Sequence, residues 1–319
     1  MRAFYCDHFV LPLPASHSFP MAKYERLRQR VVAEGILRRE DLRVPRQARW
    51  DELALVHTPA YLSAIASGTL PPEQQRRIGF PWSAAMVERA RRSVGATIEA
   101  SHAALEDIAA VNLAGGTHHA FADHGAGYCV FNDVAVAARA LLAEGRIARA
   151  AVLDADVHQG DGTARIFRDD PHVFTCSLHA AGNFPFIKET SDLDIALEDG
   201  VRDGEYLPRL RVAIDACLKH RPGVLFYVAG ADPYEGDRLG RLKLTVEGLA
   251  ARDRMVFEAA SARRVPVVAV MGGGYAPDVD AIAAIHANTV REARAVWAAR
   301  QRAREATDRT ADRARSPWP

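Results

Sequence analysis

Residues 150–163 read AAVLDADVHQGDGT, and this stretch decides the fold that we expect for the chain. Its first four residues are apolar throughout instead of alternating, which is typical of a strand buried on both faces. Polar residues begin directly after that run, with Asp154, Asp156 and His158 at alternate positions. Because alternate residues of an extended segment point to the same side, these three side chains are expected to face together.

Four more apolar runs stop at polar or glycine-rich residues in the same way. They span residues 108–113, 173–178, 224–228 and 265–271. Helical patterns lie between these runs and before the first one, at residues 83–105, 132–144, 206–220, 246–264 and 279–300. Strands that alternate with helices favour a parallel sheet with right-handed crossover connections. The sequence therefore predicts an α/β fold with one central, mainly parallel sheet.

The chain is expected to form one domain and a tail. No linker rich in Gly, Pro or Ser divides residues 1–300, which we assign to a single domain. Residues 301–319 are polar and rich in Arg, with Pro at the end. Chain ends are poorly ordered unless they dock on the domain, so a frayed or disordered tail is expected.

The composition excludes several classes of function. The 319 residues include 41 Lys and Arg and 40 Asp and Glu, and a formal net charge of +1 gives no electrostatic reason to expect nucleic-acid binding. No run reaches about 18 apolar residues, so no membrane span is predicted. The N-terminus lacks the pattern of a signal peptide. Four cysteines without a CxxC pair indicate reduced thiols and a cytoplasmic location. Nothing in these patterns sets the oligomeric state.

A metal site is predicted where the strands end. The carboxyl ends of parallel strands meet at one edge of the sheet, so Asp232 is expected near Asp156 and His158. Two Asp and one His leave an open position for water or substrate, as a catalytic zinc site requires. The same donors suit Fe(II), Co(II) or Mn(II). Any one of these residues alone could equally be a buried Asp bonded to backbone amides or a packed core His.

His118 and His119 follow Gly115 and Gly116 at the end of another predicted strand. A neutral His is the usual general base near pH 7, and a protonated His is a general acid. A catalytic His needs a carboxylate that sets its tautomer and orientation, and Asp154 and Asp161 are available for this. Two adjacent His are otherwise most often surface or packing residues.

Three glycines precede Tyr275 at the end of the last predicted strand. Glycines let the backbone approach a ligand closely, and the phenol could donate a hydrogen bond to an oxyanion beside the metal. The alternative is a flexible strand-to-helix turn followed by a packing Tyr.

Together these segments resemble the histone deacetylase family of zinc amidohydrolases, whose relatives include acetylpolyamine amidohydrolases and acetoin-utilisation proteins. The segments are GGTHHA (115–120), GYCVFND (127–133), DADVHQGDGT (154–163), AGAD (229–232) with GDRLG (236–240), and GGGY (272–275). The match runs in the family's order from about His8 to His286. Gln159, where many members carry a second His, and the short N-terminal segment are similar to the class IV branch and its bacterial homologues. The resemblance implies the arginase/deacetylase fold, a three-layer α/β sandwich.

The resemblance also implies a role for each site residue. Zinc would be held by Asp156, His158 and Asp232. Proton transfer would fall to His118, backed by Asp154, and to His119, backed by Asp161, while Tyr275 would stabilise an oxyanion. A narrow channel for the acylated side chain would be lined by Gly127, Tyr128, Phe184, Gly273 and Gly274. A structural potassium ion would be held by Asp154, Asp156, His158, Ser177 and Leu178.

The implied activity is hydrolysis of an acylated amine, and several substrates stay open. They are an acyl-lysine of a protein, an acetylated polyamine, a small metabolite and a long-chain acyl-lysine. The acidic residue with which the family binds the substrate backbone has no clear counterpart among Asp51, Glu52 and Glu73. A binuclear manganese hydrolase of the arginase type is disfavoured because Ala155 and Val157 are apolar at positions where it would need further ligands. A catalytically silent module that binds acylated amines is disfavoured because no member of the core set is missing.

Overall fold

One sheet of eight parallel strands organises the computed structural model, which describes residues 1–11, 13–14 and 17–315. The strand order is β2-β1-β3-β8-β7-β4-β5-β6. The strands are β1 (Ala3–Phe4), β2 (Leu42–Arg43), β3 (Ala109–Asn112), β4 (Ala150–Asp154), β5 (Val173–Ala180), β6 (Leu193–Leu197), β7 (Val224–Ala229) and β8 (Val267–Met271). All five predicted runs are strands of this sheet, so the predicted fold is confirmed.

Three strands were not predicted from the sequence. β1 and β2 have two residues each, and a segment this short cannot show a repeating pattern of apolar residues. β6 lies at the edge of the sheet and is mostly half-exposed, with polar Asp194 between apolar neighbours. An edge strand of this kind lacks the continuous apolar run by which the central strands were found.

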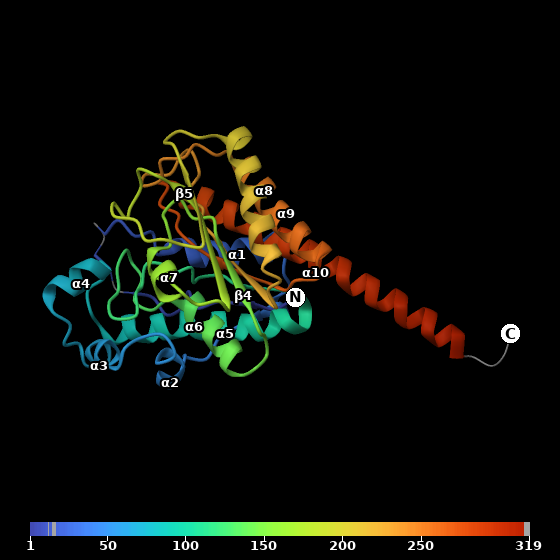
Figure 1. The fold of residues 1–319 in the computed structure, drawn as a ribbon, viewed down its shortest axis with the longest axis horizontal. Coiled ribbons are helices and arrows are strands. Elements are labelled where there is room, and N and C mark those ends of the chain that lie inside the picture. The colour runs from blue at the N-terminus through green and yellow to red at the C-terminus, as the bar shows by residue number, and fades with distance from the viewer. Residues whose placement is uncertain (12, 15–16, 316–319) are drawn as a thin grey trace.

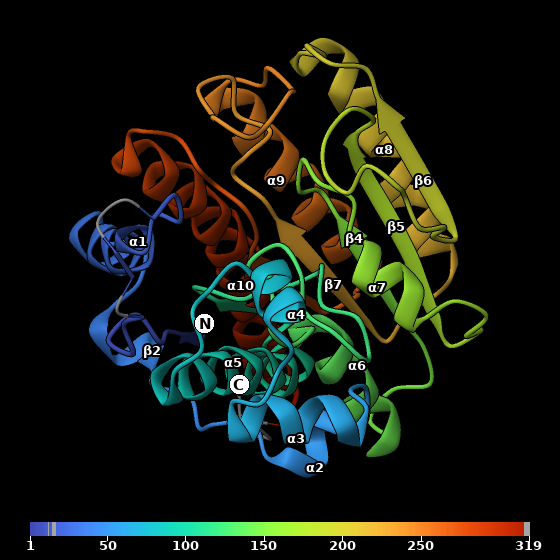
Figure 2. The same cartoon turned by 90° about the vertical axis from the view of Figure 1, so that its left-hand side faces the viewer.

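Helices cover both faces of the sheet (Figures 1 and 2). One layer contains α1 (Ala22–Ala33), α8 (Asp203–Lys219), α9 (Val246–Ala262) and α10 (Val279–Arg315). The other contains α2 (Trp50–Leu53), α3 (Pro59–Ser67), α5 (Ala84–Asp107), α6 (Asp133–Ala143) and α7 (Asp161–Ile166), and α4 (Pro72–Ile78) lies between α3 and α5 in the chain. Strand residues alternate between the two cores: Leu153 packs into the first and Val152 into the second. The expected three layers are therefore present.

The predicted helices agree with α5, α6, α8, α9 and α10, but the expected disordered tail is wrong for its first fifteen residues. α10 continues to Arg315, and its last turns project beyond the rest of the molecule in Figure 1. Ala, Arg, Glu and Gln dominate residues 298–306 and are among the strongest helix formers, so the helix can extend without packing. Residues 316–319 lie outside the described part of the chain. The division into a domain 1–300 and a tail 301–319 stays a prediction.

The parallel sheet brings all its polar strand ends to one edge. β3, β4, β7 and β8 are neighbours, and their carboxyl ends lead to the segments that carry the predicted site residues. Within the described residues, no helix is both long enough and apolar enough to cross a membrane.

His57 anchors the helix that follows one of these segments. The Nε2 atom of His57 accepts a hydrogen bond from the amide of Asn132 at 3.1 Å, so Nδ1 donates to the Phe121 carbonyl at 3.0 Å. Asn132 in turn caps α6 by accepting from the amide of Ala135 at 3.0 Å. Burial lowers the pKa of His57 to about 4, and a neutral ring is the form that this arrangement requires.

We expect His57 to make the fold acid-sensitive. Its pKa is about 6.5 in the unfolded chain and about 4 in the folded one, so the unfolded chain takes up the proton first as the pH falls. The contribution to stability is complete above pH 6.5 and decreases towards pH 4, by about 2 to 3 kcal/mol at pH 4.5. Urea unfolding of the wild type and of His57→Asn at pH 7 and pH 4.5 measures it. Equal losses of unfolding free energy in both proteins would contradict the assignment.

Candidate active site

Asp156, His158 and Asp232 converge at the carboxyl edge of the sheet. Asp156 and His158 follow β4, and Asp232 follows the neighbouring β7. The Nδ1 atom of His158 lies 3.0 Å from Oδ1 of Asp156 and 3.2 Å from Oδ2 of Asp232. One potential ligand atom from each residue lies within 4.8 Å of the other two, and all three residues are buried. The structure therefore brings together the three residues that were predicted to ligate a metal.

The chemistry of this group fits a divalent cation. Oδ2 of Asp232 is buried and, among the described residues, has no hydrogen-bond partner besides its approach to Nδ1 of His158. Burial and the charge of Asp156 raise the pKa of Asp232 to about 7. Burial lowers the pKa of His158, but the two carboxylates outweigh burial and raise it to about 10. Two buried carboxylates that face one imidazole need a positive charge between them, and a borderline metal ion such as zinc supplies it.

Backbone amides fix the orientation of both carboxylates. Oδ1 of Asp156 accepts from the amide of His158 at 2.9 Å, and Oδ2 accepts from the amide of Gly273 at 2.6 Å. Oδ1 of Asp232 accepts from the amide of Val157 at 3.0 Å. A Cβ atom at Gly273 would lie 1.8 Å from Oδ2 of Asp232, so only glycine allows this approach. The glycine turn and the carboxylates are therefore one unit.

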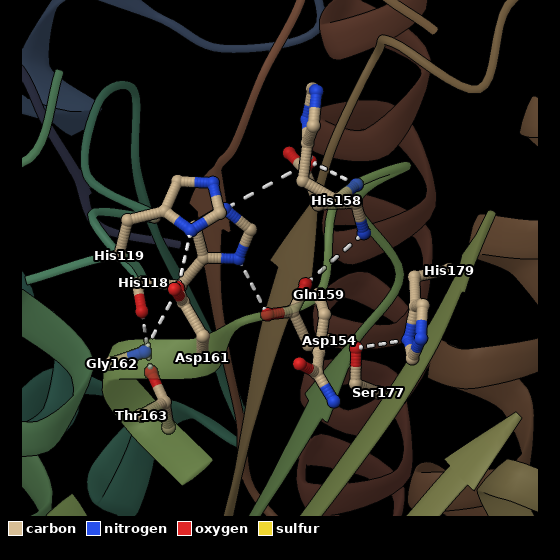
Figure 3. A network of polar contacts seen from close by, with 12 residues as sticks. His118, His119, Asp154, His158, Gln159, Asp161, Gly162, Thr163, Ser177 and His179 are labelled. Carbon is tan, nitrogen blue, oxygen red and sulfur yellow. Dashed lines mark hydrogen bonds and ion pairs between the residues drawn. The ribbon is translucent and has the colours of Figure 1, made fainter. Parts of the chain in front are cut away.

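Asp154 does not join this group. Its Oδ2 atom lies 2.6 Å from Nδ1 of His118, and its Oδ1 atom accepts from the amide of Asp156 at 3.1 Å (Figure 3). The expectation that Asp154 faces the same side as Asp156 and His158 is wrong, because the chain leaves its extended conformation after β4. Asp154 instead supports an imidazole beside the group.

The two adjacent histidines each have a carboxylate of their own (Figure 3). Nδ1 of His119 lies 2.6 Å from Oδ1 of Asp161, as Nδ1 of His118 does from Asp154. The two rings lie 4.1 Å apart between centroids, and Nε2 of His118 lies 3.9 Å from Oδ1 of Asp156. Because each Nδ1 is held by a carboxylate, each Nε2 is free to act on a substrate.

The pKa values of the two histidines move in opposite directions. Burial lowers the pKa of His118, but Asp154 and Asp156 outweigh burial and raise it to about 9. Burial and the neighbouring charge of His118 lower the pKa of His119 to about 4, against the opposing effect of Asp161. Near pH 7 the two histidines therefore carry one positive charge, which lies on the ring of His118. The ring of His119 is neutral and can act as a base.

Tyr275 faces the same group from the turn after β8. Its ring lies 6.4 Å from that of His158 between centroids. Its amide donates to Oδ2 of Asp237 at 2.6 Å, and its carbonyl accepts from Nε of Arg238 at 2.9 Å. Burial and the charges of Asp232 and Asp156 raise the pKa of Tyr275 well above its usual value. The phenol thus keeps its proton and can donate a hydrogen bond.

A cavity of about 40 Å³ is lined by His118, His119, Asp156, His158 and Tyr275. Of the predicted channel residues, Gly127, Tyr128 and Gly273 line it. Gly127 has a φ of +53°, and a Cβ there would lie 2.6 Å from Cδ2 of His119. Phe184 packs against the ring of His119 with centroids 4.9 Å apart. Phe184 and Gly274 are both absent from the lining, so their predicted places in the channel are not reproduced.

Lys23 is a site residue that the sequence analysis missed. It belongs to α1, is 2% exposed and lines the cavity together with Phe19 and Tyr24. Its Nζ atom donates to the carbonyl of Gly274 at 3.3 Å and lies 5.2 Å from the centroid of the Tyr275 ring. A contact between residues 251 positions apart leaves no local pattern, and α1 does not follow a strand.

Gln159 and three of the residues assigned to potassium, Asp154, Ser177 and Leu178, lie outside the lining of the cavity. Nε2 of Gln159 donates to the Glu189 carbonyl at 2.7 Å and to Oδ1 of Asp194 at 2.8 Å, so Gln159 anchors the segment before β6. Ser177 pairs with Asp154 across β5 and β4 and bonds to Nδ1 of His179 at 3.0 Å (Figure 3). Leu178 is fully buried in β5.

The acidic residues considered for the substrate backbone are engaged elsewhere. Asp51 and Glu52 belong to α2, where Asp51 pairs with Arg49 and Glu52 with Arg46. Glu73 pairs with Arg77 on the surface of α4. None of the three lines the cavity.

Comparison with known proteins identifies the family. The histone deacetylase domain matches residues 17–292 of this chain. The chain belongs to the histone deacetylase family. Within it, an uncharacterized protein of Picosynechococcus sp. strain PCC 7002 is 44% identical over 294 residues, which cover 92% of this chain and 98% of the relative. The acetoin utilization protein AcuC of Bacillus subtilis is 32% identical over 259 residues, covering 74% of this chain and 67% of that protein.

One further relative and one solved structure are similar to most of this chain. Histone deacetylase 2 of Arabidopsis thaliana is 29% identical over 277 residues, which cover 81% of this chain and 70% of that protein. The crystal structure of the HDA15 HD domain superposes with a TM-score of 0.76 at 20% identity and covers 91% of this chain and 90% of that one. The arginase/deacetylase-like fold expected from the sequence is thus confirmed, and family membership supports a deacetylase or amidohydrolase activity.

We expect Gly273→Ala to abolish metal binding without unfolding the chain. The added methyl group would overlap Oδ2 of Asp232 and push this carboxylate out of the group. Gly204→Ala is the matched control, because a Cβ there meets nothing within 4 Å. Metal content per chain after zinc addition and dialysis measures the effect. A Gly273→Ala protein that keeps as much metal as Gly204→Ala would contradict this account of the turn.

Proposed function

We propose that this chain is a zinc-dependent amidohydrolase that removes an acetyl or other acyl group from an amine. The observation that carries the proposal is the meeting of three kinds of group at one cavity. These are the cluster of Asp156, His158 and Asp232, two histidines with separate carboxylates, and a phenol that stays protonated. This combination supplies a metal site, a base and an oxyanion donor, which are the parts that amide hydrolysis requires.

Zinc is the proposed metal, with Fe(II) as the alternative, and both match two oxygen donors and one nitrogen donor. Held by Asp156, His158 and Asp232, the ion supplies Lewis acidity towards an amide carbonyl and lowers the pKa of a water molecule. We also propose a structural potassium ion at Asp154, Asp156, His158, Ser177 and Leu178. Its support is the adjacency of the buried Asp154 and Ser177 on paired strands.

His119 is proposed to move the proton. Its neutral ring takes a proton from the attacking water at Nε2, while Asp161 holds Nδ1. The water oxygen bonds to the carbonyl carbon, and the C–N bond then breaks as His119 returns the proton to the leaving nitrogen. His118, which Asp154 holds at Nδ1, is proposed to carry the positive charge that stabilises the negative charge developing on the substrate oxygen. The products are a carboxylic acid and a free amine.

Tyr275 is proposed to donate its phenolic proton to the oxyanion as a hydrogen bond. Its backbone is held on both sides by Asp237 and Arg238, so the ring is oriented before substrate binds. A donor that is positioned in advance stabilises the transition state more than the ground state.

We expect Tyr275→Phe to lower kcat on the order of 100-fold and to leave KM nearly unchanged, because only the transition state uses the donated hydrogen bond. Steady-state hydrolysis of an acetyl-lysine peptide, or of whichever acylated amine is turned over best, measures the effect. Tyr5→Phe serves as the control, because Tyr5 lies near β1, outside the cavity lining. Unchanged kcat in Tyr275→Phe would remove the phenol from the mechanism.

A specific cavity favours a long acyl chain as the second candidate substrate. A second cavity, of about 50 Å³, adjoins the catalytic cavity and shares Phe19, Tyr24 and Tyr128 with it. Its remaining lining is mostly apolar and includes Phe80, Met86, Val130 and Phe131, among others. An apolar space that continues from the catalytic group suits an alkyl chain better than a polyamine, whose amines would lose their hydration there.

We expect Met86→Phe to lower the ratio of octanoyl-lysine to acetyl-lysine turnover about tenfold, because the larger ring fills the apolar cavity. Met86 belongs to α5 and is 1% exposed. The two peptides are compared at low substrate concentration, where the rates report kcat/KM. An unchanged ratio would show that long acyl chains do not occupy this cavity. Acetylated amines would then be the preferred candidate substrates.

The proposed location is the cytoplasm. The four cysteines are buried and free, which agrees with a reducing compartment. The proposed partner is the acylated amine itself.

A further inference from the structure

Arg252 is the largest fully buried side chain of the protein among the described residues, and nothing in the mechanism above uses it. It belongs to α9, with 0% exposure. Its Nη1 atom donates to the carbonyl of Gly230 at 2.6 Å and to the carbonyl of Ala155 at 3.2 Å. These carbonyls lie just beyond the ends of β7 and β4, so one guanidinium nitrogen joins two neighbouring strands.

The two carbonyls lie where the ladder of the sheet ends. β4 and β7 pair in register up to Asp154 and Val228, and the amide of Ala155 still donates to the Val228 carbonyl at 3.0 Å. Past this point the segments that follow β4 and β7 turn towards the catalytic cavity. A buried carbonyl that has left the ladder needs another donor. Arg252 supplies that donor to both segments at once and thereby sets the distance between them.

The segments that Arg252 joins are the ones that carry the cluster of Asp156, His158 and Asp232. Ala155 directly precedes Asp156. Gly230 lies two residues before Asp232. It also packs closely against the segment that carries Asp156, since a Cβ atom added at Gly230 would lie 2.6 Å from Oδ2 of Asp156. A shift between the two backbones therefore moves Asp232 relative to Asp156 and His158.

The charge of Arg252 is neutralised at its own position. Nε donates to Oδ1 of Asp253 at 2.9 Å, and Asp253 also accepts from Tyr227 and from Oγ1 of Thr289. All members of this network are fully buried. A buried ion pair contributes little to stability, since apolar residues of similar volume often serve as well or better. Because the Arg252–Asp253 pair has no net charge, it influences the metal ligands by holding their backbone in place more than by its charge.

We propose that Arg252 is a positioning residue that holds the ligand segments at the separation required for metal binding. The proposal rests on the metal centre of the proposed function. It places the support of the metal site in α9, outside the two segments that carry the ligands. Supporting residues around metal ligands typically change metal affinity 10- to 100-fold when they are replaced.

The test measures zinc affinity of Arg252→Met/Asp253→Asn, in which both charges are removed together so that no unpaired ion stays buried. Competition with a chromogenic chelator gives the dissociation constant, and urea unfolding of the metal-free proteins reports the stability of the fold. We expect zinc to bind about 10- to 100-fold more weakly, with kcat reduced and KM unchanged. A zinc dissociation constant within about twofold of the wild type's would overturn the proposal.

Two further variants complete the test. Arg252→Lys keeps the charge but has only one nitrogen, which cannot pair with Asp253 as Nε does and reach the two carbonyls as Nη1 does, so it should also weaken zinc binding and serves if the double variant fails to fold. Arg89→Met is the matched control for zinc affinity alone, because Arg89 lines the adjoining apolar cavity but is a buried arginine whose Nη1 donates to two carbonyls, those of Cys6 and Phe9, away from the ligand segments. If Arg89→Met weakened zinc binding as much, the effect would come from the loss of any buried arginine, and the proposal for Arg252 would be overturned. A wild-type chain without divalent-ion affinity would overturn the metal centre itself, and the inference with it.

Discussion

The interaction on which the rest of the structure depends is the approach of two buried carboxylates to one imidazole nitrogen. Asp156 and Asp232 both lie within 3.2 Å of Nδ1 of His158, and one oxygen of Asp232 has no other partner. Such a group is unstable without positive charge, because burial removes the water that would otherwise solvate the carboxylates. This demand for positive charge is what supports the proposed affinity for a divalent ion.

The fold supplies the constraints that keep the group assembled. Parallel strands deliver all the ligands to one edge, and the glycine turn after β8 comes close enough to donate its amide to Asp156. His118 and His119 are adjacent in sequence yet differ in charge state, because Asp154 and Asp156 surround the first while the second lies beside that cation. One sheet edge thus creates a metal site and a base of different electrostatic character within a few ångströms.

Most of the central sheet and the cluster itself could be predicted from the sequence because their signals are local. The run 150–153 followed by alternating Asp, Asp and His carries both the strand and its site in nine residues. β1, β2, Lys23 and Arg252 could not be predicted, since each owes its place to contacts made across long stretches of chain. The structure also corrects Asp154, whose alternation with Asp156 ends with the strand, and the tail, where helix propensity alone extends α10.

The central claim is that this cluster holds one metal ion on which amide hydrolysis depends. The most direct measurement is the rate of carboxylate release from acylated amines, with acetyl-lysine, octanoyl-lysine and acetylpolyamine substrates compared, as zinc is added stepwise to metal-free protein. The account predicts hydrolysis of at least one substrate that rises from zero and saturates at one equivalent of zinc per chain. Hydrolysis that persists in the metal-free protein, or none on any substrate when one equivalent is bound, would contradict it.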